Sequence, residues 1–261
     1  MILIRGAGDI ASGIAIRLYR SGLTLAMTDL LKPTSIRRTV CFSEAVLHGS
    51  CTVEGITAEK AASGEEADLI WQRGHIPVFA DDEGTARTLL QPDAIVDARL
   101  AKVNPDTSIT DAPIVVAVGP GFSAGKDCHA VIETQRGHYL GRAIYEGPAA
   151  TNTGIPGNIG GYTVERLIRA PKTGTFHPIR EIGDRVAALE IVAYVDEEPV
   201  RCQIGGILRG ILPEGIHVHA GMKSGDVDPR CRPEHCLCAS DKALSVGGGV
   251  LEALLHFGYR E

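Results

Sequence analysis

Residues 115–133 read VVAVGPGFSAGKDCHAVIE, and this stretch contains the pattern that decides the fold. The apolar run from Ile114 to Val118 predicts a strand buried on both faces, as in a parallel sheet. Gly119 and Gly121 flank a proline and predict a sharp turn or a close approach of the backbone to a ligand. The chain then offers four chemically active side chains within a few residues, namely Lys126, Asp127, Cys128 and His129.

These four side chains suggest nucleophilic chemistry. A thiol beside an imidazole and an ammonium group is a setting that lowers the pKa of a cysteine. We therefore expect Cys128 to be the catalytic candidate, with His129, Lys126 and Asp127 beside it. The alternative is an ordinary core cysteine at a strand end, because free cysteines are among the most buried residues. Cys41 is a second candidate thiol, although its apolar neighbours favour a core position.

The N-terminal stretch IRGAGDIASG, residues 4–13, predicts a strand, a glycine loop and a helix. Gly6, Gly8 and Ala11 match the fingerprint of dinucleotide-binding folds. Asp29 follows a second apolar strand, where such folds place an acid on a ribose. Asp9 opens the helix, whose N-terminus suits phosphate. Shortly afterwards come Arg37 and Arg38, whose guanidinium groups are of a type that favours phosphate.

Strands and helices then alternate along the chain. Strands are expected at Ile76–Phe79 and Ala94–Asp97, and helices at Thr57–Arg73 and Glu83–Leu90. This alternation predicts a Rossmann-like α/β domain over residues 1–165, with a parallel sheet covered by helices on both faces. Ligands of such sheets bind beyond the carboxyl ends of the strands. The candidate cofactor-binding residues expected there are Gly6, Gly8, Asp9, Ala11, Asp29, Arg37, Arg38, Asp97, Arg99, Gly119 and Gly121.

After Glu165 the sequence changes to short β segments separated by turns, which predicts a small all-β domain over residues 166–230. Residues 170–186 (APKTGTFHPIREIGDRV) and 205–230 (GGILRGILPEGIHVHAGMKSGDVDPR) resemble the half-repeats of a biotinyl/lipoyl-like barrel-sandwich hybrid. The lysine that tethers a prosthetic group in such domains is not evident at the hairpin tip. Residues 231–261 are expected to form a C-terminal segment and a helix that packs back on the α/β domain.

Two features of the C-terminal segment stand out. The phrase CRPEHCLC contains Cys231, His235, Cys236 and Cys238, but this spacing differs from the usual zinc-ligand pairs, so we expect no metal. The final helix contains three consecutive glycines, residues 247–249. Because they cost about 2–3 kcal/mol relative to alanine, they predict close packing or a ligand contact.

Composition excludes several classes of function. A net charge of -6 gives no support for binding nucleic acid or an anionic membrane. No apolar run approaches the ~20 residues that cross a bilayer, and no secretory signal is evident. Seven cysteines, an odd and scattered set, fit a reducing cytoplasm. We therefore expect a cytoplasmic protein, and its apolar C-terminal helix leaves room for a homodimer.

Several phrases together resemble the YqeB-type accessory proteins of selenium-dependent molybdenum hydroxylases. They span most of the chain and include IRGAGDIASGIAIRL (4–18), VGPGFSAGKDCHAVIET (118–134), GDVDPR (225–230) and SDKALSVGGGVLEALL (240–255). The resemblance implies a role in maturing the molybdenum cofactor of hydroxylases that need labile selenium. It also implies a half similar to the cofactor-binding part of XdhC-type chaperones. The implied ligand is a molybdopterin-type cofactor or a nucleotide, with selenium as a transferred atom. The implied partners are the hydroxylase apoenzyme and other maturation proteins.

Three interpretations stay open at this level. An accessory protein either transfers selenium through a thiol, for which Cys128 is the candidate, or only binds the cofactor. An NAD(P)-dependent oxidoreductase is the alternative, motivated by the glycine loop and Asp29, although no hydride-transfer partner is evident and a fold does not imply a function. A docking module built on the β domain is the third.

Overall fold

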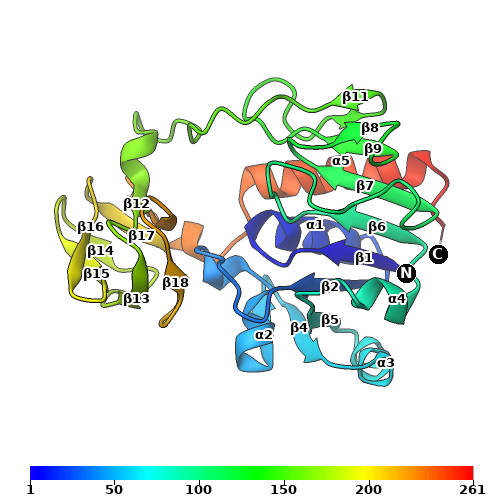
Figure 1. Ribbon diagram of the computed structural model, residues 1–261, viewed down its shortest axis with the longest axis horizontal. Helices are drawn as coiled ribbons and strands as arrows, with labels where there is room; N and C mark the ends of the chain where they lie inside the picture. The colour runs from blue at the N-terminus through cyan, green and yellow to red at the C-terminus, as the bar shows by residue number, and fades with distance from the viewer. Residues whose placement is uncertain (261) are drawn as a thin grey trace. The chain divides into compact units, whose positions relative to one another are not determined.

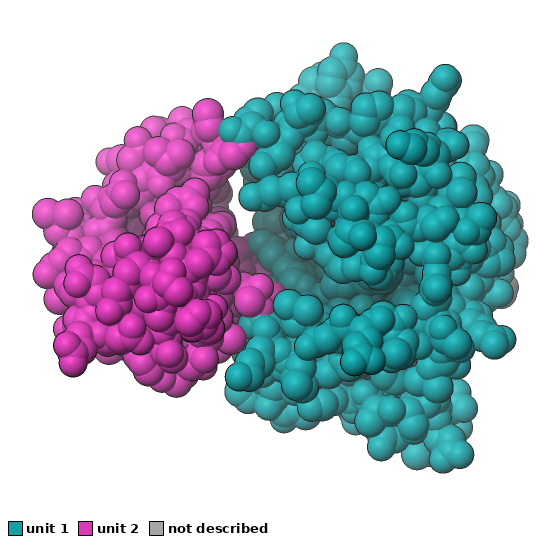
Figure 2. Space-filling model, in the orientation of Figure 1, with its two compact units in different colours: residues 1–33, 41–153, 239–261 teal, residues 34–40, 154–238 magenta. Residues whose placement is uncertain are grey.

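The computed structural model describes residues 1–260. The chain divides into two compact units, coloured separately in Figure 2. The first comprises residues 1–33, 41–153 and 239–261, and the second comprises residues 34–40 and 154–238. No helix within residues 1–260 is long and apolar enough to cross a membrane.

A nine-stranded sheet forms the centre of the first unit, in the order β10-β9-β7-β6-β1-β2-β5-β4-β3 (Figure 1). The pairs from β4 to β9 are parallel, whereas β3 and β10 pair antiparallel at the two edges. A separate two-stranded ladder joins β8 (Ser123–Ala124) and β11 (Gly147–Pro148). The strands of the large sheet are β1 (Ile2–Arg5), β2 (Leu25–Asp29), β3 (Ser50–Val53), β4 (Ile56–Ala61), β5 (Ile76–Ala80), β6 (Ala94–Asp97), β7 (Ile114–Val118), β9 (Ala130–Ile132) and β10 (Ala143–Ile144).

Helices cover both faces of this sheet. Side chains of α3 (Gly64–Gln72) and α4 (Ala86–Leu90) share a buried cluster with Leu3 and Ile95 on one face. On the other face α1 (Asp9–Arg20) packs against α5 (Asp241–His256), as Figure 1 shows. The short helix α2 (Glu44–His48) contacts β3, β4 and β5.

Glycines allow α1 and α5 to approach closely. A Cβ atom on Gly247 would lie 3.0 Å from the carbonyl oxygen of Gly13, and one on Gly13 would collide with Ala243. A Cβ on Gly249 would collide with the carbonyl of Gly141, whereas Gly248 has no neighbour within 4 Å. The expected close packing of the glycine run is therefore confirmed at two of its three positions.

Part of the predicted helix Thr57–Arg73 is wrong. Its first residues belong to β4, which pairs with β3 in a hairpin, and only Gly64–Gln72 is helical. Buried Ile56 and Ala58 alternate with half-buried Thr57 and Glu59, which is the strand rather than the helix period. Ser63 marks the true helix start, because its side chain accepts a hydrogen bond from the N–H of Glu66.

Two four-stranded antiparallel sheets form the second unit around one hydrophobic core. Their orders are β12-β19-β17-β14 and β16-β15-β13-β18. Three short 3-10 helices, η1 (Arg38–Val40), η2 (Val164–Arg166) and η3 (Pro233–Cys236), accompany them. The strands are β12 (Leu167–Arg169), β13 (Gly174–Pro178), β14 (Arg185–Val186), β15 (Ile191–Val195), β16 (Glu198–Arg201), β17 (Gly206–Ile211), β18 (His217–Val218) and β19 (Lys223–Asp228).

The predicted fold class, a Rossmann-like parallel sheet followed by a barrel-sandwich hybrid, is wrong as a whole. The large sheet is mixed, because hairpins add an antiparallel strand at each edge. Helices make up only 22% of the chain, and the second unit recruits residues 34–40 from far upstream. The structure is a mixed α/β protein with several sheets.

Candidate functional site at the carboxyl edge of the large sheet

Because β1, β2, β6, β7 and β9 run parallel, their carboxyl ends meet at one edge of the large sheet. The glycine loop after β1 is bound to the end of β2. The carboxylate of Asp29 accepts hydrogen bonds from the N–H groups of Ala7 and Leu30, both at 2.8 Å. Gly6 has a φ of +107°, and a Cβ there would lie 3.0 Å from the carbonyl oxygen of Ala98. The loop is therefore packed tightly between the ends of β2 and β6.

The N-terminus of α1 emerges from this loop. Gly8 is its N-cap residue and supplies no side-chain hydrogen bond. The first N–H groups of a helix have no acceptor within the helix, and the helix dipole makes this end attractive to anions. Buried Ala11 keeps the first turn close to the sheet. The predicted anion site at Gly6, Gly8, Asp9 and Ala11 stays a prediction. The geometry of the α1 start is suitable for an anion.

Lys242 is a residue of this edge that the sequence analysis missed. It lies in the first turn of α5, directly before Ala243, which packs on Gly13 of α1. Burial is the main cause that lowers the pKa of Lys242, and Arg136 lowers it further. Asp9 and Glu133 act in the opposite direction. Lys242 therefore lies within electrostatic range of the α1 start and of the end of β9.

Asp97 and Arg99 form a structural network. The guanidinium of Arg99 binds the buried Asp97 carboxylate at 2.6 Å and Asp106 at 2.6 Å. Arg5 also binds Asp106, at 2.8 Å, and Thr107 donates a hydrogen bond of 2.5 Å to Asp97. The arginines hold the pKa of Asp106 down at about 2, and the carboxylates raise the pKa of Arg99 in spite of its burial. Each charge has a counter-charge, so this network fixes the loop after β6 and leaves no charge for a ligand.

Gly119 and Gly121 serve close packing at the same edge. A Cβ on Gly119 would lie 3.0 Å from the hydroxyl of Thr134, and one on Gly121 would lie 2.6 Å from Val103. Both glycines have positive φ values, +83° and +104°, which L side chains rarely adopt. Glu133 follows β9 here and accepts hydrogen bonds from the backbone N–H groups of Gln135 and Ala150.

Cys128 lies at the opposite end of β7 from Gly119. The chain turns back after Gly121, so that β9 starts beside the beginning of β7 and runs parallel to it. The ring of His129 accepts a hydrogen bond of 3.0 Å from the N–H of Val115, and the backbone N–H of His129 donates to the Val115 carbonyl. Gly119 lies four residue steps after Val115 along the strand, or about 13 Å. The two halves of the stretch 119–129 therefore do not share a site.

The surroundings of Cys128 do not support a reactive thiol. Its side chain is fully buried in a cluster with Val115, Phe122 and Val131. Burial is the main cause that raises its pKa to about 12, and the negative charge of Asp127 adds to the shift. Asp127 itself accepts a hydrogen bond from the N–H of Ser123, and Lys126 is exposed. The interpretation of Cys128 as a core cysteine fits this geometry. Cys41 is likewise buried.

Arg37 and Arg38 belong to the second unit. The guanidinium of Arg37 donates to the carbonyl oxygens of His235 and Cys238 at 2.9 and 3.2 Å. Arg38 donates to the carbonyl of Ile211 at 3.0 Å. The chain passes from the first unit to the second at residue 34, and the suggested phosphate-binding role of Arg37 and Arg38 stays a prediction. Within residues 1–260 no group of three or more His, Cys, Asp or Glu side chains has a metal-binding arrangement.

Comparison with solved structures gives weak similarities to aspartoacylase-type proteins. An aspartoacylase family protein from Mesorhizobium loti has a TM-score of 0.28 and 13% identity, covering 88% of this chain and 86% of that one. A succinylglutamate desuccinylase/aspartoacylase from Rhodobacter sphaeroides has a TM-score of 0.22 and 21% identity, covering 24% and 21%. These similarities carry no argument about activity.

Comparison with sequences gives a clear relative. No protein-family model matches the chain. An uncharacterized protein of Escherichia coli (strain K12) named YqeB is 49% identical over 255 residues, which cover 98% of this chain and 47% of that protein. The chain thus spans about half the length of this curated relative. The expected resemblance to a YqeB-type protein is confirmed along almost the whole chain.

Proposed function

We propose that this protein is an accessory protein for the maturation of selenium-dependent molybdenum hydroxylases. It binds a molybdopterin-type cofactor, or a related phosphate-bearing ligand, at the carboxyl edge of the large sheet. The observation that carries this proposal is the start of α1, which Gly8 leaves without a side-chain cap and which Lys242 approaches from α5. The choice of cofactor comes from the resemblance to YqeB-type accessory proteins, and the 49% identical YqeB relative supports that resemblance.

The residues at this edge fit a phosphate group. Backbone N–H groups at a helix start donate to phosphate oxygens, and an ammonium group adds a point charge. The partial burial of Lys242 strengthens its attraction for an anion, because less water screens the charge. The bound cofactor supplies the molybdenum and dithiolene chemistry. The protein's own residues bind and orient its phosphate.

The binding-only version of the function is favoured over transfer through Cys128. A thiol that holds selenium must be accessible and able to ionise. Cys128 is fully buried and its pKa is raised to about 12, so it meets neither requirement. We therefore propose that the protein holds the cofactor while another protein or a small molecule delivers selenium.

The test is calorimetric titration of the full chain with a molybdopterin-type cofactor, and in parallel with NAD+ and NADP+. We expect binding of the cofactor by the wild type and at least about tenfold weaker binding by Lys242→Met, because a charge-assisted contact is lost. Lys60→Met, which removes an exposed lysine of β4, is the matched control. Tight NAD(P) binding without cofactor binding would support the oxidoreductase instead.

A further inference from the structure

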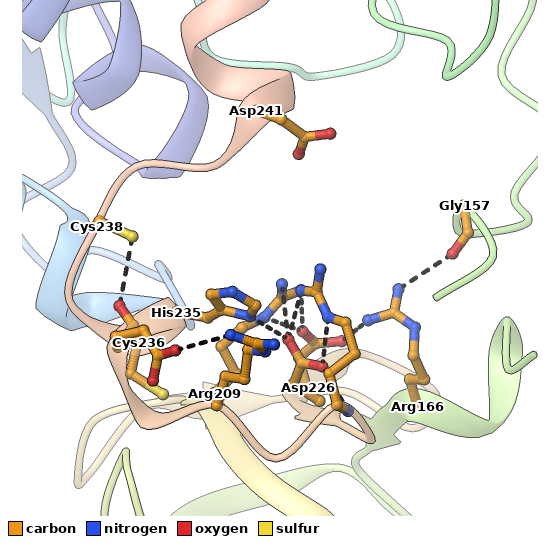
Figure 3. A network of polar contacts seen from close by, with 12 residues as sticks. Gly157, Arg166, Arg209, Asp226, His235, Cys236, Cys238 and Asp241 are labelled. Carbon is orange, nitrogen blue, oxygen red and sulfur yellow. Dashed lines mark hydrogen bonds and ion pairs between the residues drawn. The ribbon is translucent and has the colours of Figure 1, made fainter. Parts of the chain in front are cut away.

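The buried charges of the second unit balance one another (Figure 3). Arg166 and Arg209 bind the carboxylate of Asp226 at 2.8 and 2.5 Å. Arg209 also lies 3.5 Å from Asp228. Buried carboxylates require such counter-charges, so this network joins η2 and β17 to β19 and stabilises the unit. The outer face of α5, in the first unit, differs in this respect.

Four residues form an apolar stripe on the outer side of α5. The inner side of the helix packs in the core through Ala243, Val246, Val250 and Leu254. The α5 stripe consists of residues at steps of four, three and four, which share one face of a helix, namely Leu244, Gly248, Leu251 and Leu255. Leu255 is 47% exposed, and the other three residues are half-buried. An outer helix face normally carries polar side chains, and this stripe has none.

Gly248 lies in the middle of the stripe and has no packing role within the chain. A Cβ on Gly247 or Gly249 would meet a backbone carbonyl oxygen of a neighbouring segment, whereas one on Gly248 would have no neighbour within 4 Å. Glycine destabilises the interior of a helix relative to alanine. No contact within the described residues accounts for this cost, and a glycine lets another backbone approach closely.

Two exposed charges of opposite sign flank the stripe. Arg17 of α1 donates from Nε to the carbonyl of Leu244 at 3.2 Å, so its guanidinium lies at the N-terminal end of the stripe. Glu252 lies one turn after Gly248, toward the C-terminal end, and accepts a hydrogen bond of 3.0 Å from the Tyr145 hydroxyl. Within residues 1–260 neither Arg17 nor Glu252 forms an ion pair. The stripe therefore presents one unpaired charge of each sign, at opposite ends.

We propose that the α5 stripe binds the same stripe of a second copy of this chain. The two α5 helices run antiparallel and cross at Gly248. In this twofold arrangement the N-terminal end of each stripe meets the C-terminal end of the other. Arg17 of one copy then faces Glu252 of the other, twice by symmetry, and the leucines pack between these pairs. Because the stripe is complementary to itself in charge, it fits a second copy better than an unrelated protein. This interface does not depend on the proposed function.

Sedimentation equilibrium of the full chain over a range of protein concentrations tests the proposal. We expect the wild type to dimerise. Gly248→Ala should weaken dimerisation about tenfold or more, because a methyl group at the crossing point holds the helices apart. Within the protomer that methyl group meets open space, so the variant should unfold no more easily than the wild type at dilutions where both are monomeric. A loss of dimers is then not a result of misfolding.

A charged side chain in the stripe is the second variant. Leu255→Lys should weaken dimerisation, because it places a charge in an apolar contact. Leu69→Lys is the matched control, since Leu69 of α3 is similarly exposed, at 53%, and lies outside the stripe. This control should leave dimerisation unchanged.

Exchange of the two charges identifies the partner as a second copy. Arg17→Glu and Glu252→Arg should each weaken dimerisation, because like charges then face each other across the interface. The double variant Arg17→Glu/Glu252→Arg should recover dimerisation, since opposite charges face each other again. A wild type that is monomeric at all concentrations overturns the proposal in favour of a different partner protein. Dimerisation that Gly248→Ala and Leu255→Lys leave unchanged, or a double variant no better than the single ones, overturns it as well.

Discussion

The carboxylate of Asp29 accepts a hydrogen bond of 2.8 Å from the backbone N–H of Ala7, and this bond ties the end of β2 to the loop before α1. The acid position that suggested a ribose contact is thus occupied by the protein's own backbone. Asp29 shapes the loop that presents the helix start, so at the proposed site we expect ligand specificity to come from other side chains.

Substitution of Asp29 separates the role of its oxygens from that of its charge. Burial raises the pKa of Asp29, the N–H groups of Ala7 and Leu30 oppose this shift, and Asp82 adds to it. The folded state therefore binds the proton more tightly than the unfolded chain. Stability falls as the pH rises from the unfolded pKa of about 3.9 through the higher folded pKa. Asp29→Asn keeps an acceptor and removes the charge, so we expect it to be at least as stable as the wild type at pH 7.

Asp29→Ala is the matched variant, because it leaves the Ala7 N–H without its acceptor. We expect a loss of about 1–3 kcal/mol in the free energy of unfolding. Urea unfolding at pH 4 and pH 7 measures both variants. Equal destabilisation by asparagine and alanine would show that the charge itself holds the loop.

Thiol reactivity distinguishes a core cysteine from a nucleophile at position 128. With a pKa of about 12, only about one Cys128 thiol in ten thousand is ionised at pH 8, and its side chain is fully buried. Cys238 is exposed. We expect iodoacetamide to modify Cys238 in the native protein within minutes and Cys128 only after unfolding, as read by peptide mass spectrometry.

A maturation assay completes this test. Cys128→Ala should keep cofactor binding and hydroxylase maturation, because the residue contributes packing and no chemistry. Native-state alkylation of Cys128 at a rate similar to that of Cys238, or loss of maturation in a folded Cys128→Ala variant, contradicts the core assignment.

The glycine run of α5 offers two neighbouring substitutions with opposite outcomes. Gly248→Ala places a methyl group in open space, so we expect a gain of about 0.5–1 kcal/mol in unfolding free energy from helix propensity. Gly249→Ala drives a Cβ into the carbonyl of Gly141, and such overpacking costs about 1–3 kcal/mol. Thermal unfolding of both variants measures the difference. A stabilised Gly249→Ala variant would mean that α5 packs less closely than described.

Local sequence patterns predicted the features that depend on neighbouring residues in the chain, namely strands and the close packing of a helix. The apolar runs predicted the strands ending at Arg5, Asp97 and Val118, and the three glycines predicted close packing of α5. The position of Cys128 was not predictable from its neighbours, because the chain reverses between Gly121 and β9. Although Cys128 and Gly119 are close along the sequence, this reversal places them at opposite ends of β7.

The same limit applies to larger distances along the chain. Lys242 comes within electrostatic range of Asp9 only because α5 packs along α1, and no local pattern predicts such an approach. Arg37 follows Asp29 closely but enters the second unit, where its hydrogen bonds go to His235 and Cys238. The predicted helix over Thr57–Arg73 was wrong because pairing with β3 overrode helix propensity in its first residues.

Lys242 gives the most direct test of whether the edge is a binding site, because binding and stability should change in opposite directions. Burial first, and then Arg136, lower the pKa of Lys242, while Asp9, Glu133 and Asp241 oppose the shift. The unfolded chain thus binds this proton more tightly than the folded protein. Stability rises with pH between the lowered folded pKa and the unfolded value of about 10.4, and below that range the charge is a net cost to folding.

Lys242→Met should therefore be at least as stable as the wild type at pH 7 and yet bind the phosphate-bearing ligand at least about tenfold more weakly. An anion beside Lys242 raises its pKa again, so ligand binding at a pH near the lowered pKa should take up a proton. Calorimetry in buffers of different ionisation enthalpy measures that uptake, and Lys60→Met should leave it unchanged. Loss of stability together with unchanged ligand affinity would show that Lys242 only supports the packing of α5.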